Sequence, residues 1–147
     1  MLFRSIAANL KDMDREFFVV LCMDAAGKVQ FLNIASIGTV NQALIHPREI
    51  YKPAVLSNSS SVILAHNHPS GSLSPSPEDL KATELLMSAG KILGIEVNDH
   101  IIIGGGSGKM LSMRREGLLP DLEGRDLKQL RNAAEPAKSI SEKTRQL

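Results

Sequence analysis

Residues 61–94, SVILAHNHPSGSLSPSPEDLKATELLMSAGKILG, carry the strongest structural pattern in the chain. The run SVILA is short, wholly apolar and bounded by serines, which is typical of a strand buried on both faces. From Pro77 onward, apolar residues recur at helical spacing until Gly94, so we expect a helix there. The histidine-containing loop follows the strand's carboxyl end, where open α/β sheets commonly place ligands.

The flanking segments predict further strands. Residues 16–24 and 28–38 are two β-rich runs separated by a turn at Gly27, which indicates a hairpin. Residues 95–106 and 109–113 supply one or two more strands, and the glycines between them indicate a flexible turn.

Shorter helices are expected elsewhere. Apolar residues recur every four positions in residues 1–14. Pro47, which follows His46, suits the first turn of a second helix, whereas Pro53 predicts a kink or a later start. Strands and helices interleave along the chain, so the predicted fold class is α/β with a mixed central sheet flanked by helices.

Length and composition predict one globular domain. The chain has 147 residues, of which 43% are hydrophobic and 22% charged. We place this domain in residues 1–121. Residues 122–147 are rich in charge and lose apolar periodicity toward the end, which predicts a C-terminal helix followed by a tail.

The charge balance gives no sign of a polyanionic partner. Lysine and arginine number 17 against 16 acidic residues, and aromatic residues make up only 3%. DNA contact is therefore possible but not supported by charge. The single cysteine, Cys22, lies in an apolar run, and no segment approaches the roughly 20 apolar residues of a membrane span. We expect a cytoplasmic protein without membrane attachment; the sequence indicates no particular oligomeric state.

His66 and His68 are the best candidates for metal ligands. On a strand or extended loop, two residues one position apart project to the same side. Imidazole suits zinc, and two histidines with one carboxylate leave a fourth position for water, as in hydrolytic zinc sites. Asp79 is the best third ligand, because the intervening loop could fold the helix start back against the histidines.

The same residues allow a purely structural interpretation. Ser76 as helix N-cap, Pro77 at the first helical position and acidic Glu78 and Asp79 in the first turn need no metal. Isolated histidines are also more often structural than ligands. On the residues alone, both interpretations stay open.

The spacing His66-x-His68, seven residues, then Ser76-x-x-Asp79, resembles the JAMM signature of the MPN (JAB) metallopeptidase-like domain. The wider sequence, including LIHPREIYKPA, AGKILGIEVNDHIIIG and MRREGLL, resembles the RadC branch of that family over a core of about residues 15–119. Longer RadC proteins resemble this chain only in their C-terminal half. Their preceding helix-hairpin-helix region has no counterpart here, so any DNA contact made by that region is unsupported.

The resemblance implies a cytidine-deaminase-like fold with one zinc ion per chain held by His66, His68 and Asp79. It also implies that Glu16, at the start of the first sheet strand, is the general base, although on the residues alone an exposed strand end is the favoured interpretation. Ser76 would help stabilise the oxyanion during amide hydrolysis. Asn67 or backbone carbonyls are candidates to fix the imidazole tautomers.

The expected function is zinc-dependent hydrolysis of a peptide or isopeptide bond in an unknown protein or peptide substrate. The alternative is a nuclease-like or non-catalytic accessory module associated with DNA repair or recombination. A nuclease site would need further ligands, and only His46 and His100 remain among the histidines. For His100, beside the apolar run IIIG, a hydrogen bond at a strand edge is favoured over metal binding, and the resemblance leaves a site-lining role open.

Overall fold

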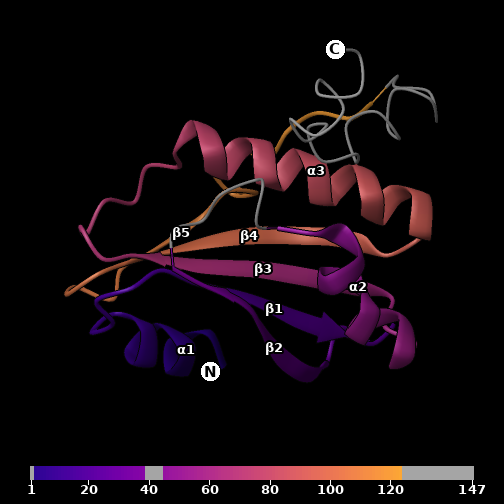
Figure 1. The fold of residues 1–147 in the computed structure, drawn as a ribbon, viewed down its shortest axis with the longest axis horizontal. Helices are drawn as coiled ribbons and strands as arrows, with labels where there is room; N and C mark the ends of the chain where they lie inside the picture. Colours follow the sequence, from indigo (N-terminus) through magenta and orange to yellow (C-terminus); the bar gives the residue numbers. More distant parts are fainter. Residues whose placement is uncertain (1, 39–44, 124–147) are drawn as a thin grey trace, which may run out of the picture.

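The apolar run SVILA forms part of the middle strand of a mixed sheet. The computed structural model describes residues 2–38 and 45–123, and within them the sheet has five strands in the order β2-β1-β3-β4-β5 (Figure 1). The strands are β1 (Phe17–Met23), β2 (Val29–Ile37), β3 (Ser61–His68), β4 (Glu96–Gly104) and β5 (Met110–Ser112). β3 and β4 are parallel and the other neighbours antiparallel, which confirms the predicted α/β class.

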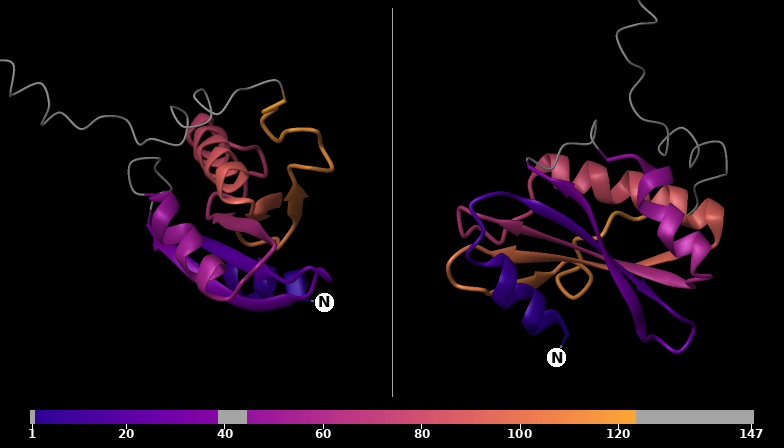
Figure 2. Two further views of the ribbon diagram at one scale, coloured as in Figure 1. Left: turned by 90° about the vertical axis from the view of Figure 1, so that its right-hand side faces the viewer. Right: turned by 60° about the horizontal axis from the view of Figure 1, so that its bottom comes forward.

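Helices cover both faces of this sheet. They are α1 (Leu2–Leu10), α2 (Pro47–Leu56) and α3 (Pro77–Leu93). α2 and α3 pack on one face and α1 on the other (Figure 2). Side chains of β1 point alternately to the two layers: Phe18 and Val20 pack with α2 and α3, and Val19 packs with α1. None of the helices in the described ranges is long and apolar enough to cross a membrane.

Two boundaries differ from the sequence prediction, and one of the two alternatives for α2 is excluded. β3 continues to His68, so the histidines belong to the strand instead of following it. The parallel ladder with β4 causes this, because its pairing extends to His68 and Gly104. α2 begins at Pro47 and continues through Pro53, so a later start was wrong. α1 ends at Leu10. The predicted C-terminal helix and tail stay predictions, since residues 124–147 lie outside those described.

α3 is the crossover that joins the parallel strands β3 and β4, and its first turn lies beside the end of β3. The helix begins with a capping box: Ser76 Oγ accepts from the Asp79 N–H, and the Asp79 carboxylate accepts from the Ser76 N–H. It ends at Gly94, whose φ of 74° is in the left-handed region. Local helix capping therefore fixes Asp79 at the carboxyl end of β3.

The turn after β4 packs closely against the loop after β3. The Gly105 N–H donates to the carbonyl of His68 at 2.8 Å. A Cβ at position 105 would lie only 2.6 Å from the Pro69 carbonyl oxygen, so glycine is required by the close approach of two backbones. The sequence predicted a flexible turn here, whereas in the structure this turn is hydrogen-bonded to the end of β3.

Candidate metal site

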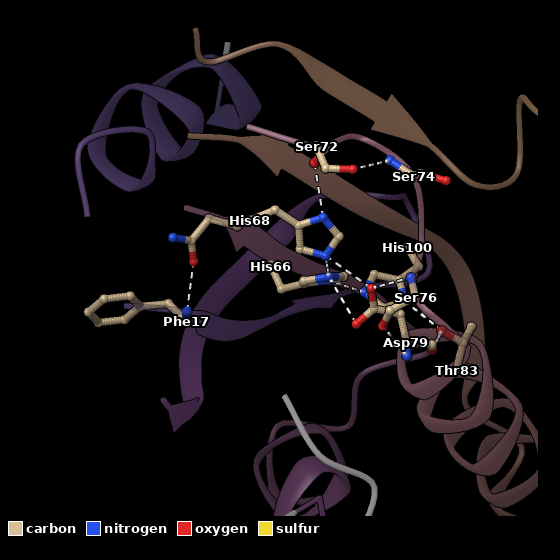
Figure 3. Close-up of polar contacts among 10 residues, drawn as sticks. Phe17, His66, His68, Ser72, Ser74, Ser76, Asp79, Thr83 and His100 are labelled. Carbon is tan, nitrogen blue, oxygen red and sulfur yellow. Dashed lines mark hydrogen bonds and ion pairs between the residues drawn. The ribbon is translucent and has the colours of Figure 1, made fainter. Parts of the chain in front are cut away.

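Three of the residues selected from the sequence meet at one point. His66 and His68 come from the end of β3, and Asp79 comes from the first turn of α3 (Figure 3). Each offers one ligand atom, and these atoms all lie within 4.8 Å of one another. All three residues are buried, with at most 8% of their surface exposed. The group could hold a metal ion.

The atoms that face one another in this group are suited to a shared cation. His66 Nε2 lies 2.9 Å from His68 Nε2, while Asp79 Oδ2 lies 3.0 Å from His68 Nε2 and Asp79 Oδ1 lies 3.2 Å from His66 Nε2. A carboxylate offers only acceptors, and each neutral imidazole offers a lone pair on one nitrogen. Such a convergence is stable only when a proton or a metal ion lies among these atoms.

The second nitrogen of His68 is fixed by the backbone. His68 Nδ1 lies 2.9 Å from the carbonyl oxygen of Ser72, and a carbonyl can only accept. Nδ1 therefore carries the hydrogen, and a neutral His68 presents its Nε2 lone pair to the site. This arrangement is the usual outer hydrogen bond of a metal-ligating histidine.

A third histidine lies behind His66. His100 on β4 is fully buried, and its Nε2 lies 2.7 Å from His66 Nδ1. The sequence favoured a hydrogen bond at a strand edge for His100, and the family resemblance left a site-lining role open. The parallel ladder between β3 and β4 pairs His100 with Leu64, two residues before His66. Residues two apart share a face. The position of His100 could therefore have been found only once this pairing was known.

The electrostatics of the group follow from burial and mutual contact. Burial opposes ionisation of Asp79, but hydrogen bonds from His66 and His68 outweigh it and hold the pKa of Asp79 far below its ordinary value. The hydrogen bond to Asp79 raises the pKa of His68 more than burial lowers it. Burial, and after it the neighbouring His66, hold the pKa of His100 well below its ordinary value. Asp79 is thus ionised and His100 neutral near neutral pH.

Helix capping and cluster formation are not alternatives for Asp79. Its Oδ2 accepts from the Ser76 N–H at 2.9 Å while also contacting His68. The two interpretations left open by the sequence are therefore compatible. The helix start both satisfies its own backbone and delivers a carboxylate to the histidines.

Glu16 and Ser76 open onto the same pocket as the cluster. This pocket has a volume of about 380 Å³. It is lined by Glu16, His68, Ser70, Ser72, Ser74, Ser76, Glu78 and Asp79. Glu16 is half-buried, directly before β1, and its negative charge contributes, after Asp79, to the raised pKa of His68. Glu49, by contrast, is an exposed residue of α2 paired with Arg48.

Asn67 has a different role from the one considered in the sequence. Its side-chain hydrogen bonds go to the backbone: its Oδ1 accepts from the Phe17 N–H at 2.7 Å, and its Nδ2 donates to the Arg15 carbonyl at 2.8 Å. These two bonds hold the backbone on both sides of Glu16. The residue between the two histidines thus orients the segment that carries the acidic residue.

The comparison with known families agrees with this geometry. The sequence profile of the RadC-like JAB domain matches residues 1–118. The chain belongs to the RadC-like JAB domain family. The predicted family membership is therefore confirmed. The profile covers every residue of the group formed by His66, His68 and Asp79, together with Glu16 and Ser76.

The relatives of this RadC-like chain include several UPF0758 proteins. A UPF0758 protein of Methanosarcina barkeri is 44% identical over 76% of this chain and 48% of its own length. UPF0758 proteins of Desulforamulus reducens and Rubrobacter xylanophilus are 44% and 46% identical, each over 78% of this chain and 49% of their own length. The chain thus spans about half the length of these relatives.

Proposed function

We propose that this RadC-like domain is a zinc-dependent hydrolase that cleaves a peptide or isopeptide bond. The observation that carries the proposal is the convergence of His66, His68 and Asp79 beside Glu16 in one pocket. Two imidazoles and one carboxylate form the ligand set of hydrolytic zinc sites, which keep a further position for water. The described residues contain one such group, so we expect close to one zinc ion per chain.

The roles of the surrounding residues follow from their positions. Zinc, when bound, would lower the pKa of a coordinated water to about 7 and polarise a substrate carbonyl. Glu16 accepts the proton of the attacking water and then gives it to the leaving amine. Ser76 Oγ accepts from the Asp79 N–H at 3.1 Å, a bond that leaves the hydroxyl hydrogen to donate to the oxygen of the attacked carbonyl.

The charge of the pocket favours an amide over a phosphodiester substrate. Its lining includes the acidic residues Glu16, Glu78 and Asp79, and no lysine or arginine among the described residues that line it. A phosphodiester is an anion, and nuclease sites bind it and stabilise its transition state with basic residues or with two metal ions, whereas the described residues offer one metal group. A peptide bond is neutral and needs neither. This observation supports a peptidase over the nuclease-like alternative.

The proposal is tested with a library of peptides derived from whole-cell protein, incubated with zinc-loaded chain. Cleavage is detected by mass spectrometry as new amino termini. We expect Glu16→Gln to retain its zinc and to cleave about 10² to 10⁴-fold more slowly, because it cannot accept the proton. Glu49→Gln should retain full activity, since Glu49 lies on α2 and does not line the pocket. Glu78→Gln should retain most of it, because adjacent helix residues point about 100° apart and Glu78 is exposed where Asp79 is buried in the cluster.

The metal content of the protein tests the ligand assignment independently of cleavage activity. Elemental analysis should find about one zinc ion per wild-type chain and almost none in His66→Ala. A folded His66→Ala protein with full zinc content would refute the ligand assignment. Wild-type protein that holds zinc but cleaves no more than Glu16→Gln would instead support a non-catalytic binding module.

A further inference from the structure

We propose that Thr83 and His100 are positioning residues that fix Nε2 of His66 as its metal-binding nitrogen. The inference rests on the proposed zinc site, but it concerns two residues outside the ligand group. Thr83 lies on α3 and His100 on β4, whereas His66 lies on β3. Hydrogen bonds between these elements form a chain that runs from the backbone of α3 to the ligand (Figure 3).

The first link determines which nitrogen of His100 carries hydrogen. Thr83 Oγ1 donates to the carbonyl of Asp79 at 2.6 Å. A hydroxyl has only one hydrogen, and a carbonyl can only accept. Thr83 Oγ1, which lies 2.7 Å from His100 Nδ1, must therefore accept from that nitrogen. The hydrogen of His100 is on Nδ1.

The second link transfers this constraint to His66. With its hydrogen on Nδ1, a neutral His100 has a lone pair on Nε2. His66 Nδ1 lies 2.7 Å from that lone pair and donates to it. His66 then presents the lone pair of its own Nε2 toward His68 and Asp79.

The same hydrogen positions follow when the series of hydrogen bonds is read from His66 instead of from Thr83. A histidine that binds metal through Nε2 carries its hydrogen on Nδ1 and needs an acceptor there. The hydrogen-bond partner of His66 Nδ1 is His100 Nε2, which can accept only when His100 carries its hydrogen on Nδ1. That hydrogen in turn needs Thr83 Oγ1 as an acceptor. Both directions give one consistent set of hydrogen positions.

Burial makes this series of hydrogen bonds hard to replace. Thr83, His100 and His66 each have 0% exposed surface, so water cannot substitute for a missing partner. Phe18 confines both rings: it stacks on His66 at 6.2 Å and meets His100 edge-on at 5.7 Å between ring centroids. His68 is oriented differently, through the Ser72 carbonyl in an exposed loop. The two histidine ligands therefore respond to different substitutions.

The test compares hydroxyl variants on α3. Thr83→Val removes the acceptor with little change in shape, and Thr83→Ser restores a hydroxyl. Ser88→Ala is the matched control, because buried Ser88 Oγ donates to the Glu84 carbonyl four residues earlier, as Thr83 does to Asp79. Zinc affinity is measured by competition with a chelator, using Zn²⁺ alone as the probe. The tautomer of His100 is read in metal-free protein from the ¹⁵N shifts of its ring; the chain has four histidines, so assignment is straightforward.

We expect His100 to carry its hydrogen on Nδ1 in the wild type and in Thr83→Ser. Thr83→Val should lose that tautomer and bind zinc about 10 to 100-fold more weakly, whereas Ser88→Ala should bind like the wild type. A wild-type His100 with hydrogen on Nε2 would overturn the inference, as would unchanged zinc affinity in a folded Thr83→Val protein. A wild type that shows the Nδ1 tautomer but binds no zinc would support the hydrogen-bond chain and refute the proposed metal site.

Discussion

The Asn67 side chain continues the pairing of β1 and β3 beyond the point where their backbone ladder ends. That ladder stops at the pair of Phe18 and His66. One residue further, Asn67 Oδ1 accepts from the Phe17 N–H at 2.7 Å. Its Nδ2 donates to the Arg15 carbonyl, so one buried amide satisfies the backbone on both sides of Glu16. The strand that carries the two histidines thereby also positions the proposed base.

Asn67→Ala should lower turnover without removing zinc. The substitution frees the backbone around Glu16, and misplacing a catalytic group by about 1 Å can cost roughly 10²-fold in rate. It should also destabilise the fold by about 1–3 kcal/mol, since it removes two part-buried hydrogen bonds, each worth about 0.5–1.5 kcal/mol. Peptide cleavage, zinc content and chemical denaturation measure the three effects. Asn98→Ala is the control, because Asn98 bonds to Ser61 at the other end of β3. Full activity in Asn67→Ala would show that these two hydrogen bonds do not position Glu16.

Gly105→Ala should weaken zinc binding, because the added Cβ would press against the backbone of His68 and Pro69 at the end of β3. Its Cβ would lie 2.6 Å from the Pro69 carbonyl oxygen and 2.8 Å from that of His68, so the turn or the loop must move. Such crowding costs about 1–3 kcal/mol in stability. In Gly106→Ala, by contrast, the Cβ meets nothing within 4 Å, and the strain comes only from a φ of 78°. Thermal unfolding should show both proteins destabilised, and chelator competition should show weaker zinc binding in Gly105→Ala alone. Equal zinc affinity in the two would exclude this coupling.

The sequence predicted most of the fold because its patterns were local. The capping signal at Ser76, the apolar run of β3 and the turn at Gly27 each depend on a few neighbouring residues. The end of β3 was wrong because pairing with a parallel partner extended the strand through His68. Sequence periodicity contains no information about that partner.

The same difference separates the site residues that the sequence identified from those that it did not. His66, His68 and Asp79 were selected because they share a short segment with a recognisable spacing. Thr83 was missed and the role of His100 was left open, because their link to His66 depends on how α3 and β4 pack against β3. Asn67 was noticed, but its partners lie about 50 residues away, at the start of the adjacent strand and just before it. Hydrogen bonds between distant segments become visible only when the fold is known.

Duplex DNA should bind this chain only weakly near physiological salt. The net charge is +1 and aromatic residues make up 3% of the chain, so few phosphates can be neutralised and few bases stacked. We expect a dissociation constant of about 10⁻⁴ to 10⁻⁶ M, typical of non-specific binding, which weakens further as salt rises. A mobility-shift titration at several salt concentrations measures this. Tight binding that resists salt would favour the accessory-module alternative.

Asp79→Asn and Ser76→Ala should separate the metal role of the α3 start from its capping role. The asparagine side chain can still accept from the Ser76 N–H, so the cap survives, but the carboxylate that faces His66 and His68 loses its charge. Thermal unfolding of the wild type should occur at a higher temperature with zinc than with chelator, because a ligand that binds only the folded state stabilises it. That difference should nearly vanish in Asp79→Asn. Ser76→Ala should keep the difference while unfolding at a lower temperature under both conditions, because a lost N-cap typically costs about 1 kcal/mol. Zinc-dependent stabilisation that persists in full in Asp79→Asn would remove Asp79 from the ligand set and leave it with the capping role alone.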